Sequence, residues 1–203
     1  MAGGTVLILE GPVDSLEALR GFRGVDLVVE DVRYELEPPV VLEQAEPIES
    51  IQLFAENQWD NLVTSVADAH ERATGSGSKL AIIDTGIDHR HPDLHNVDVD
   101  TSASIIDGVI GPHDGDVEGH GTHVAGIAGG TGVVGITGVA PDATLVSVRV
   151  FDEEGGASFG DILLAIQYAA VIGADGANLS IGTAPIPPDA NRFQYRGIME
   201  PVV

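Results

Sequence analysis

Glu118-Gly-His120-Gly-Thr-His123-Val-Ala-Gly-Ile127 opens on glycines, turns apolar at helical spacing, and has His120 where a helix would begin. A second stretch, Leu80-Ala-Ile-Ile-Asp84-Thr-Gly-Ile-Asp88, is a short apolar run that ends on a carboxylate and a Gly turn. Its length and branched side chains predict a buried strand with Asp84 at the carboxyl end. Open α/β sheets bind their ligands at that edge. A buried Asp can hold a neighbouring imidazole in one tautomer and stabilise the imidazolium, so we expect Asp84 and His120 to form a catalytic pair.

Three motifs carry a family resemblance: Ile83-Asp84-Thr-Gly86, His120-Gly-Thr-His-Val-Ala-Gly126 and Gly138-Val-Ala-Pro141. Together, in this order, they resemble the subtilisin-like serine protease (subtilase, peptidase S8) family. The resemblance implies an α/β fold with a doubly wound, mostly parallel sheet, and a serine endopeptidase that uses a Ser-His-Asp triad. The family's nucleophile stands in a Gly-Thr-Ser-Met-Ala segment, and no serine of this chain has that context. We therefore expect an incomplete catalytic domain, truncated before the catalytic Ser and inactive as given.

The composition is strongly acidic. Asp and Glu number 32 against 9 Lys and Arg, which gives a net charge of −23, while 43% hydrophobic residues argue against disorder. Nucleic acid is excluded as a partner, because its phosphates would be repelled. Two interpretations remain open: a solvated surface adapted to high salt, as in a halophilic protein, or a surface that scavenges calcium.

Two further features of the sequence concern its location. No apolar run approaches the roughly 18 residues that span a bilayer, so no membrane partner is expected. No signal peptide is visible after Met1. The family resemblance nevertheless implies an extracellular protein, whose export signal would lie outside these residues.

The first part of the chain predicts a small β-α-β unit. Strands are expected over residues 5–9 and 25–29, with a helix from Asp14 or Ser15 between them and an extended piece at Tyr34 and Leu36. The unit resembles part of the inhibitory propeptide of subtilases, and a generic small α+β cap is the alternative. We expect residues 1–46 to form this partial propeptide-like unit with its linker, and to contact the catalytic portion over residues 47–203. A helix is also expected from Trp59, with Leu62, Val63 and Val66 on its apolar face.

Three histidines, His89, His91 and His95, fall close together in the segment that follows Asp84. Pro92 breaks any helix that could align them, so zinc is a minor alternative. By family resemblance, Asp93 of His-Pro-Asp-Leu would be a ligand of a structural calcium ion. The Gly-rich loop over residues 129–133 weakens this expectation, because it lacks the Asn residues of the family's calcium-binding insertions. No catalytic cofactor is implied.

The same resemblance implies a binding site for a peptide or protein substrate. Gly155, Gly156 and Ala157 would form an edge that pairs with extended substrate, and Phe159 would line an apolar subsite, although it could equally be a core aromatic. The backbone of Ser180, Ile181 and Gly182 would form a second wall.

Two other function classes stay open. One is a non-catalytic acidic binding module or pseudoenzyme, and the other is a metalloprotein that uses the histidine cluster.

Overall fold

A five-stranded sheet with the strand order β4-β3-β5-β2-β7 is the centre of the protein. The computed structural model describes residues 7–12, 14–36 and 58–182. In chain order, the elements are α1 (Ser15–Arg20), β1 (Arg33–Glu35), α3 (Trp59–Val63), α4 (Val66–His70), β2 (Lys79–Asp84), the 3-10 turn η1 (Pro92–Leu94), β3 (Ala103–Ile106), β4 (Val109–Pro112), α5 (His120–Gly129), β5 (Thr144–Arg149), β6 (Gly156–Ser158), α6 (Phe159–Val171) and β7 (Gly176–Asn178).

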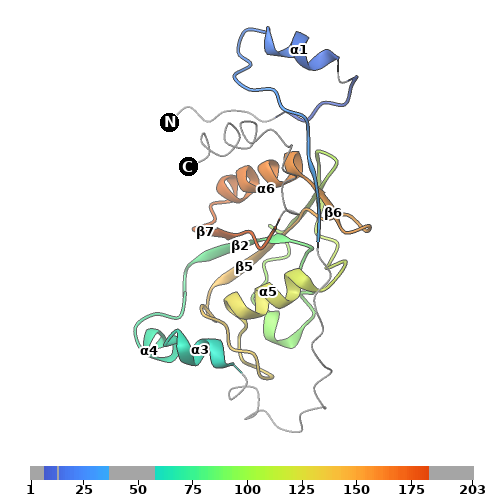
Figure 1. Cartoon of the computed structure of the whole chain (residues 1–203). Helices are drawn as coiled ribbons and strands as arrows, with labels where there is room; N and C mark the ends of the chain where they lie inside the picture. Colours follow the sequence, from blue (N-terminus) through green and yellow to red (C-terminus); the bar gives the residue numbers. More distant parts are fainter. Residues whose placement is uncertain (1–6, 13, 37–57, 183–203) are drawn as a thin grey trace.

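Helices cover both faces of the sheet, with α6 on one side and α5 on the other (Figure 1). The alternation of side chains along the buried strands produces two cores. Ala81 and Ile83 of β2 pack with α6, whereas Ile82 packs with Ala125 of α5 and Leu145 of β5. A strand that is buried on both faces reads as a continuous apolar run, as β2 does.

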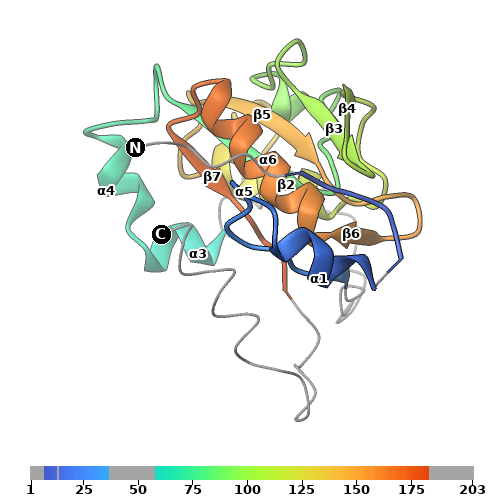
Figure 2. The same ribbon diagram turned by 90° about the horizontal axis from the view of Figure 1, so that it is seen from above.

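The sheet is mostly parallel. β5 pairs in parallel with β2 and β3, β2 pairs in parallel with β7, and only the β3–β4 hairpin is antiparallel. Figure 2 shows this hairpin at one edge of the sheet and β7 at the other. The predicted fold class is confirmed, and Asp84 ends β2, which lies between β5 and β7, at the carboxyl edge of the sheet.

The predicted β-α-β unit does not form in the described part of the N-terminal region. The helix is confirmed as α1, but residues 7–9 and 25–29 are not strands. Leu7, Leu9 and Leu27 remain exposed, because so short a segment has too little apolar surface to build its own core. Residues 33–35 instead form β1, the blue arrow beside β6 in Figure 1, which pairs antiparallel with β6. Residues 37–57, which include the predicted domain boundary, lie outside the described residues.

The helix expected from Trp59 is divided in two. Ser65 adopts a left-handed conformation between α3 and α4, with φ of 57°. Of the predicted apolar face only Val66 is buried, while Leu62 and Val63 are exposed. The prediction of one continuous inward face was wrong, because the break at Ser65 changes the direction of the side chains.

Gly121 lets α5 approach the end of β2. A Cβ atom at this position would lie 2.1 Å from the carbonyl oxygen of Gly86 and 3.1 Å from Cβ of Asp84. The start of α5 can therefore approach the end of β2 this closely only where residue 121 has no side chain.

We predict that Gly121→Ala lowers the free energy of unfolding by about 3 kcal/mol, because backbone must move to relieve the clash. The measurement is urea-induced unfolding followed by circular dichroism. Gly126→Ala is a matched control in the same helix, since its Cβ would meet only the Ile136 side chain at 3.6 Å. The control should be neutral or stabilising by up to about 1 kcal/mol. Equal effects of the two substitutions would contradict the close-approach argument.

Candidate active site

Asp84 and His120 are brought together by β2 and α5. Nδ1 of His120 donates a hydrogen bond to Oδ1 of Asp84 at 2.7 Å. The Asp84 side chain is fully buried, whereas that of His120 is 27% exposed. With Nδ1 engaged, Nε2 is the imidazole nitrogen that can exchange a proton with a substrate or a nucleophile. The predicted pair is therefore present with the geometry of the Asp and His of a catalytic triad.

Burial sets the charge properties of Asp84. Burial raises the pKa of its carboxyl group, and hydrogen bonds from His120 and from the Thr85 amide only partly oppose this. Oδ2 is buried and has no hydrogen-bond partner among the described residues. An incompletely solvated carboxylate favours an imidazolium next to it, because pairing compensates part of the desolvation. Asp84 is thus suited to stabilise a positive charge on His120.

Asp116 connects the elements that carry this pair, and the sequence analysis did not identify it. Its Oδ1 accepts hydrogen bonds from the Thr85 hydroxyl at 2.7 Å and from the Gly119 amide at 2.8 Å. Its Oδ2 accepts from the Thr122 amide at 2.9 Å and from the Thr122 hydroxyl. The Thr85 hydroxyl also accepts from the Gly121 amide at 2.8 Å. One carboxylate therefore fastens the start of α5 to the residue that follows Asp84.

The electrostatics of Asp116 differ from those of Asp84. Burial alone would raise its pKa, but the hydrogen bonds from Thr122, Gly119 and Thr85 outweigh burial and hold the pKa below its usual range. The signal in the sequence was the position of Asp116 four residues before the start of α5. A carboxylate there can accept hydrogen bonds from the amides at the beginning of the helix, which have no partner within the helix.

The predicted substrate edge is occupied by residues of the same chain. β6 contains Gly156 and Ala157, and β1 pairs with it in the register Tyr34 opposite Ala157. The Leu36 amide donates to the Gly155 carbonyl at 3.2 Å. Ring centroids of Tyr34 and Phe159 lie 6.1 Å apart. The structure thus brings together all four residues predicted on this side of the site, in contact with an extended strand.

The second predicted wall lies after β7. Ile181 packs against the same core cluster as Leu36, and the Ser180 hydroxyl donates to Oδ1 of Asn178 at 2.8 Å. Gly182 is the last residue described in this part of the chain, and it is exposed. A substrate-binding role for Ser180, Ile181 and Gly182 stays a prediction.

Asp93 is held by backbone amides. Its side chain is buried, and its oxygens accept from the Val134 amide at 2.7 Å and the Ile136 amide at 3.0 Å. Burial would raise its pKa, but these amides outweigh burial and keep the pKa below its usual range. The carboxylate thus organises the loop after α5, and calcium ligation by Asp93 stays a prediction.

The three histidines face different partners. Nδ1 of His89 lies 3.3 Å from Nε2 of His113, Nδ1 of His91 accepts from the Asp93 amide, and Nδ1 of His95 contacts the Pro92 carbonyl and the Thr131 hydroxyl. Within residues 7–12, 14–36 and 58–182, no three His, Asp or Glu side chains gather where they could hold a metal ion.

A buried Asp–His pair at the carboxyl edge of a doubly wound sheet is an arrangement that enzymes with a catalytic triad use. A model of the subtilase family (peptidase S8) matches residues 75–199, and this chain belongs to that family. An alkaline protease of Alkalihalobacillus alcalophilus is 37% identical over 184 residues, which are 86% of this chain and 46% of the relative. Thermitase of Thermoactinomyces vulgaris is 38% identical, over 64% of this chain and 46% of the relative.

A solved structure agrees with these relatives. The MycP3 protease from the type VII (ESX-3) secretion system is 32% identical, with a TM-score of 0.53, and the match covers 64% of this chain and 38% of that one. The chain therefore spans less than half the length of these similar proteins.

We predict that Asp116→Asn lowers the free energy of unfolding by about 2 kcal/mol, because an amide nitrogen would face donors that now point at a carboxylate oxygen. The Nδ1 proton of His120, followed by NMR, should exchange faster with water as α5 loosens from β2. Asp68→Asn, at an exposed position of α4, is the matched control and should change stability by less than about 0.5 kcal/mol. An unchanged His120 signal in the Asp116 variant would show that this carboxylate does not position the imidazole.

Asp93 gives a prediction for acid stability. A depressed pKa in the folded state means that the contribution of Asp93 is complete above the unfolded value of about 3.9 and is lost as pH falls through the folded value. Asp93→Asn should therefore be less stable than the wild type by a constant amount above about pH 5, and this gap should narrow below about pH 4. The difference in the free energy of unfolding between the wild type and Asp93→Asn is measured from unfolding curves recorded at intervals of about one pH unit between pH 7 and pH 2.5. A gap that stays constant through the acid range would exclude this role.

Proposed function

We propose that this chain supplies the Asp and His of a serine endopeptidase, with Asp84 orienting His120. The hydrogen bond of 2.7 Å between a buried carboxylate and a partly exposed imidazole carries the proposal. Membership of the subtilase family supports it independently.

The reaction would run through an acyl-enzyme. Nε2 of His120 would accept the proton of a serine hydroxyl as the oxygen attacks the substrate's peptide carbonyl. His120 would then donate that proton to the leaving amine, and Asp84 would stabilise the imidazolium between these steps. Water, deprotonated by the same nitrogen, would release the acyl group. The serine would come from a Gly-Thr-Ser-Met-Ala-type segment outside these 203 residues, so the chain alone would have negligible activity.

Substrate would bind as an extended strand along β6, where main-chain hydrogen bonds give affinity without demanding a sequence. Residues 31–36 model this binding mode, because the Phe159 amide donates to the Val32 carbonyl at 2.8 Å and the Gly160 amide to Asp31 at 3.0 Å. We assign this segment the role of a propeptide-like element that covers the edge. Cleavage of protein substrates would then require its release.

The setting of the enzyme would be extracellular and saline. No helix in the described part of the chain is long and apolar enough to cross a membrane. The net charge of −23 would be screened in molar salt, where the Debye length is about 3 Å. A calcium ion at Asp93 would be structural rather than catalytic.

The test is peptide hydrolysis by a longer chain that continues through a Gly-Thr-Ser-Met-Ala-type segment encoded after Val203. We expect turnover of a fluorogenic peptide that falls about 10⁴-fold or more in Asp84→Asn and in His120→Ala. His123→Ala, on the same helix, should retain activity to within about ten-fold, because it lacks the bond to Asp84. The 203-residue chain should give no turnover above background.

Two results would reject the proposal. One is absence of any such segment in all three frames downstream, and the other is hydrolysis that survives His120→Ala. Saturable peptide binding without turnover by the longer chain would favour the non-catalytic binding module.

A further inference from the structure

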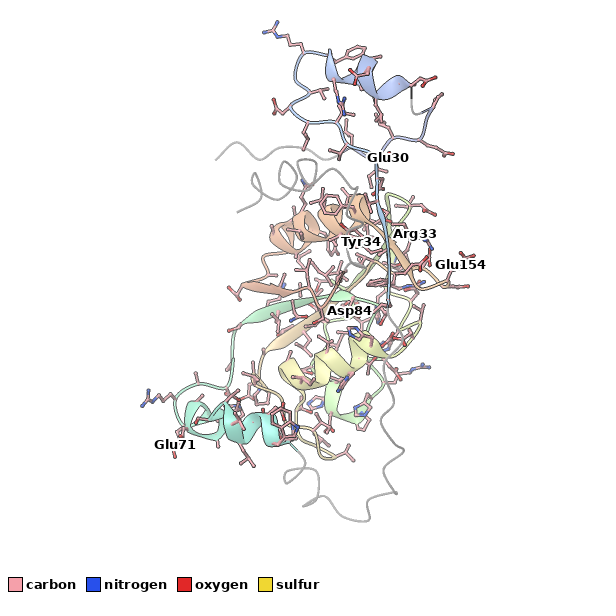
Figure 3. All side chains as sticks on the ribbon, viewed as in Figure 1. Glu30, Arg33, Tyr34, Glu71, Asp84 and Glu154 are labelled. Atoms are coloured by element: carbon pink, nitrogen blue, oxygen red, sulfur yellow. The ribbon has the colours of Figure 1, made fainter. Side chains whose placement is uncertain are left out.

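The acidic turn between β5 and β6 holds a cation at the substrate edge. The Arg33 guanidinium of β1 forms an ion pair with Oδ2 of Asp152, and Oε2 of Glu154 lies 3.9 Å from the same nitrogen. Figure 3 shows Arg33 and Glu154 side by side where β1 meets this turn. The Arg33 side chain is 48% exposed and that of Asp152 is 26% exposed. This ion pair is therefore accessible from solvent and open to exchange with another strand.

The turn is built to receive this cation. Oδ1 of Asp152 accepts from the Gly156 amide and the Glu154 amide, both at 2.9 Å, which fixes the direction of Oδ2. A Cβ atom on Gly156 would lie 2.2 Å from the Arg33 guanidinium carbon, so the guanidinium lies directly over a residue that has no side chain. Hydrogen bonds from Gly156 and Arg33 outweigh burial and hold the pKa of Asp152 below its usual range, so this anion is present at neutral pH.

We infer that Asp152 determines specificity by selecting an arginine or lysine side chain in any peptide that pairs with β6. The inference rests on the proposed endopeptidase function and names its substrate class. In the observed register the basic residue, at the position of Arg33, lies opposite Ser158. The next residue, at the position of Tyr34, lies beside Phe159, and the amide at the position of Leu36 donates to the Gly155 carbonyl. Arginine is favoured over lysine, because a planar guanidinium can lie flat on Gly156 while it donates to Asp152.

The general acidity of the chain is the competing explanation, because a net charge of −23 attracts any cationic peptide. Glu153 distinguishes the general acidity of the chain from a local site at Asp152. It belongs to the same turn and is exposed, but the Arg33 ion pairs are with Asp152 and Glu154. If the site is local, the preference for a basic peptide depends on the charge of Asp152 and not on the charge of Glu153.

The experiment uses the full chain with Arg33→Glu, in which Asp152 repels the chain's own strand. Fluorescein-labelled peptides of residues 30–36 (Glu-Asp-Val-Arg-Tyr-Glu-Leu) are titrated by anisotropy in about 0.1 M salt. Two further peptides replace the arginine by citrulline, which keeps its shape without its charge, or by alanine. We expect the arginine peptide to bind about five-fold more tightly than either, as for a partly exposed ion pair.

The protein variants localise the effect. Asp152→Asn should bring the arginine-to-citrulline affinity ratio close to one, and Glu153→Gln should leave it at about five. Equal binding of the arginine and citrulline peptides overturns the inference whether or not Asp152→Asn folds well. The inference is also overturned if Glu153→Gln abolishes the arginine-to-citrulline affinity ratio as fully as Asp152→Asn does. It is overturned as well if the arginine peptide does not bind at about 1 mM.

The readout is binding, so it does not depend on turnover. An arginine preference without hydrolysis by the longer chain would reject the endopeptidase function and leave Asp152 as a recognition residue. Hydrolysis that is indifferent to arginine would reject only the present inference.

Discussion

A buried carboxylate at the end of the inner strand β2 is the constraint on which the rest of the structure depends. Asp84 is fully buried, so its charge requires hydrogen-bond donors, and the available donors are His120 at the start of α5 and the Thr85 amide. The helix must therefore come close to the strand. Glycine at residue 121 permits that distance, and Asp116 maintains it by accepting hydrogen bonds from both sides.

The two carboxylates show how one fold gives similar groups different tasks. Asp116 accepts hydrogen bonds from both hydroxyls and amides, which stabilise its charge and make it a structural anchor. Asp84 has a raised pKa and one oxygen, Oδ2, without a hydrogen-bond partner among the described residues, so its charge is incompletely compensated there. This deficit is relieved when a proton arrives on His120, which is the moment at which a protease needs the imidazolium stabilised. If both oxygens of Asp84 had all their hydrogen-bond donors, the carboxylate would stabilise a positive charge on His120 less strongly.

Local patterns predicted the buried strand that ends on Asp84 and its pairing with His120, because a short apolar run and the residues that end it indicate both, whereas the doubly wound sheet was expected from the family resemblance. β2, β5 and α6 are covered on their inner faces, so burial fixes their positions. The predicted strand over residues 25–29 does not form for the opposite reason: the described part of the chain supplies no partner strand for its apolar residues, and an isolated segment does not form a sheet by propensity alone. Asp116 was missed because its role depends on Thr85, 31 residues away, and only the folded chain brings them together.

β1 and β6 form a two-stranded sheet of their own, in which each strand supplies hydrogen-bond partners for the backbone of the other. Main-chain bonds at Leu36 and Phe159 would hold almost any extended strand, so the side chains that alternate along it must supply selectivity. The chain's own strand has the further advantage that it belongs to the same molecule, because pairing within one chain is favoured by a raised effective concentration. A peptide of equal intrinsic affinity would then bind poorly while residues 33–36 remain connected to the sheet. Cleavage of the chain between β1 and the rest of the protein would make the pairing with β6 a bimolecular equilibrium. At equal affinity, β6 would then bind whichever strand is present at the higher concentration.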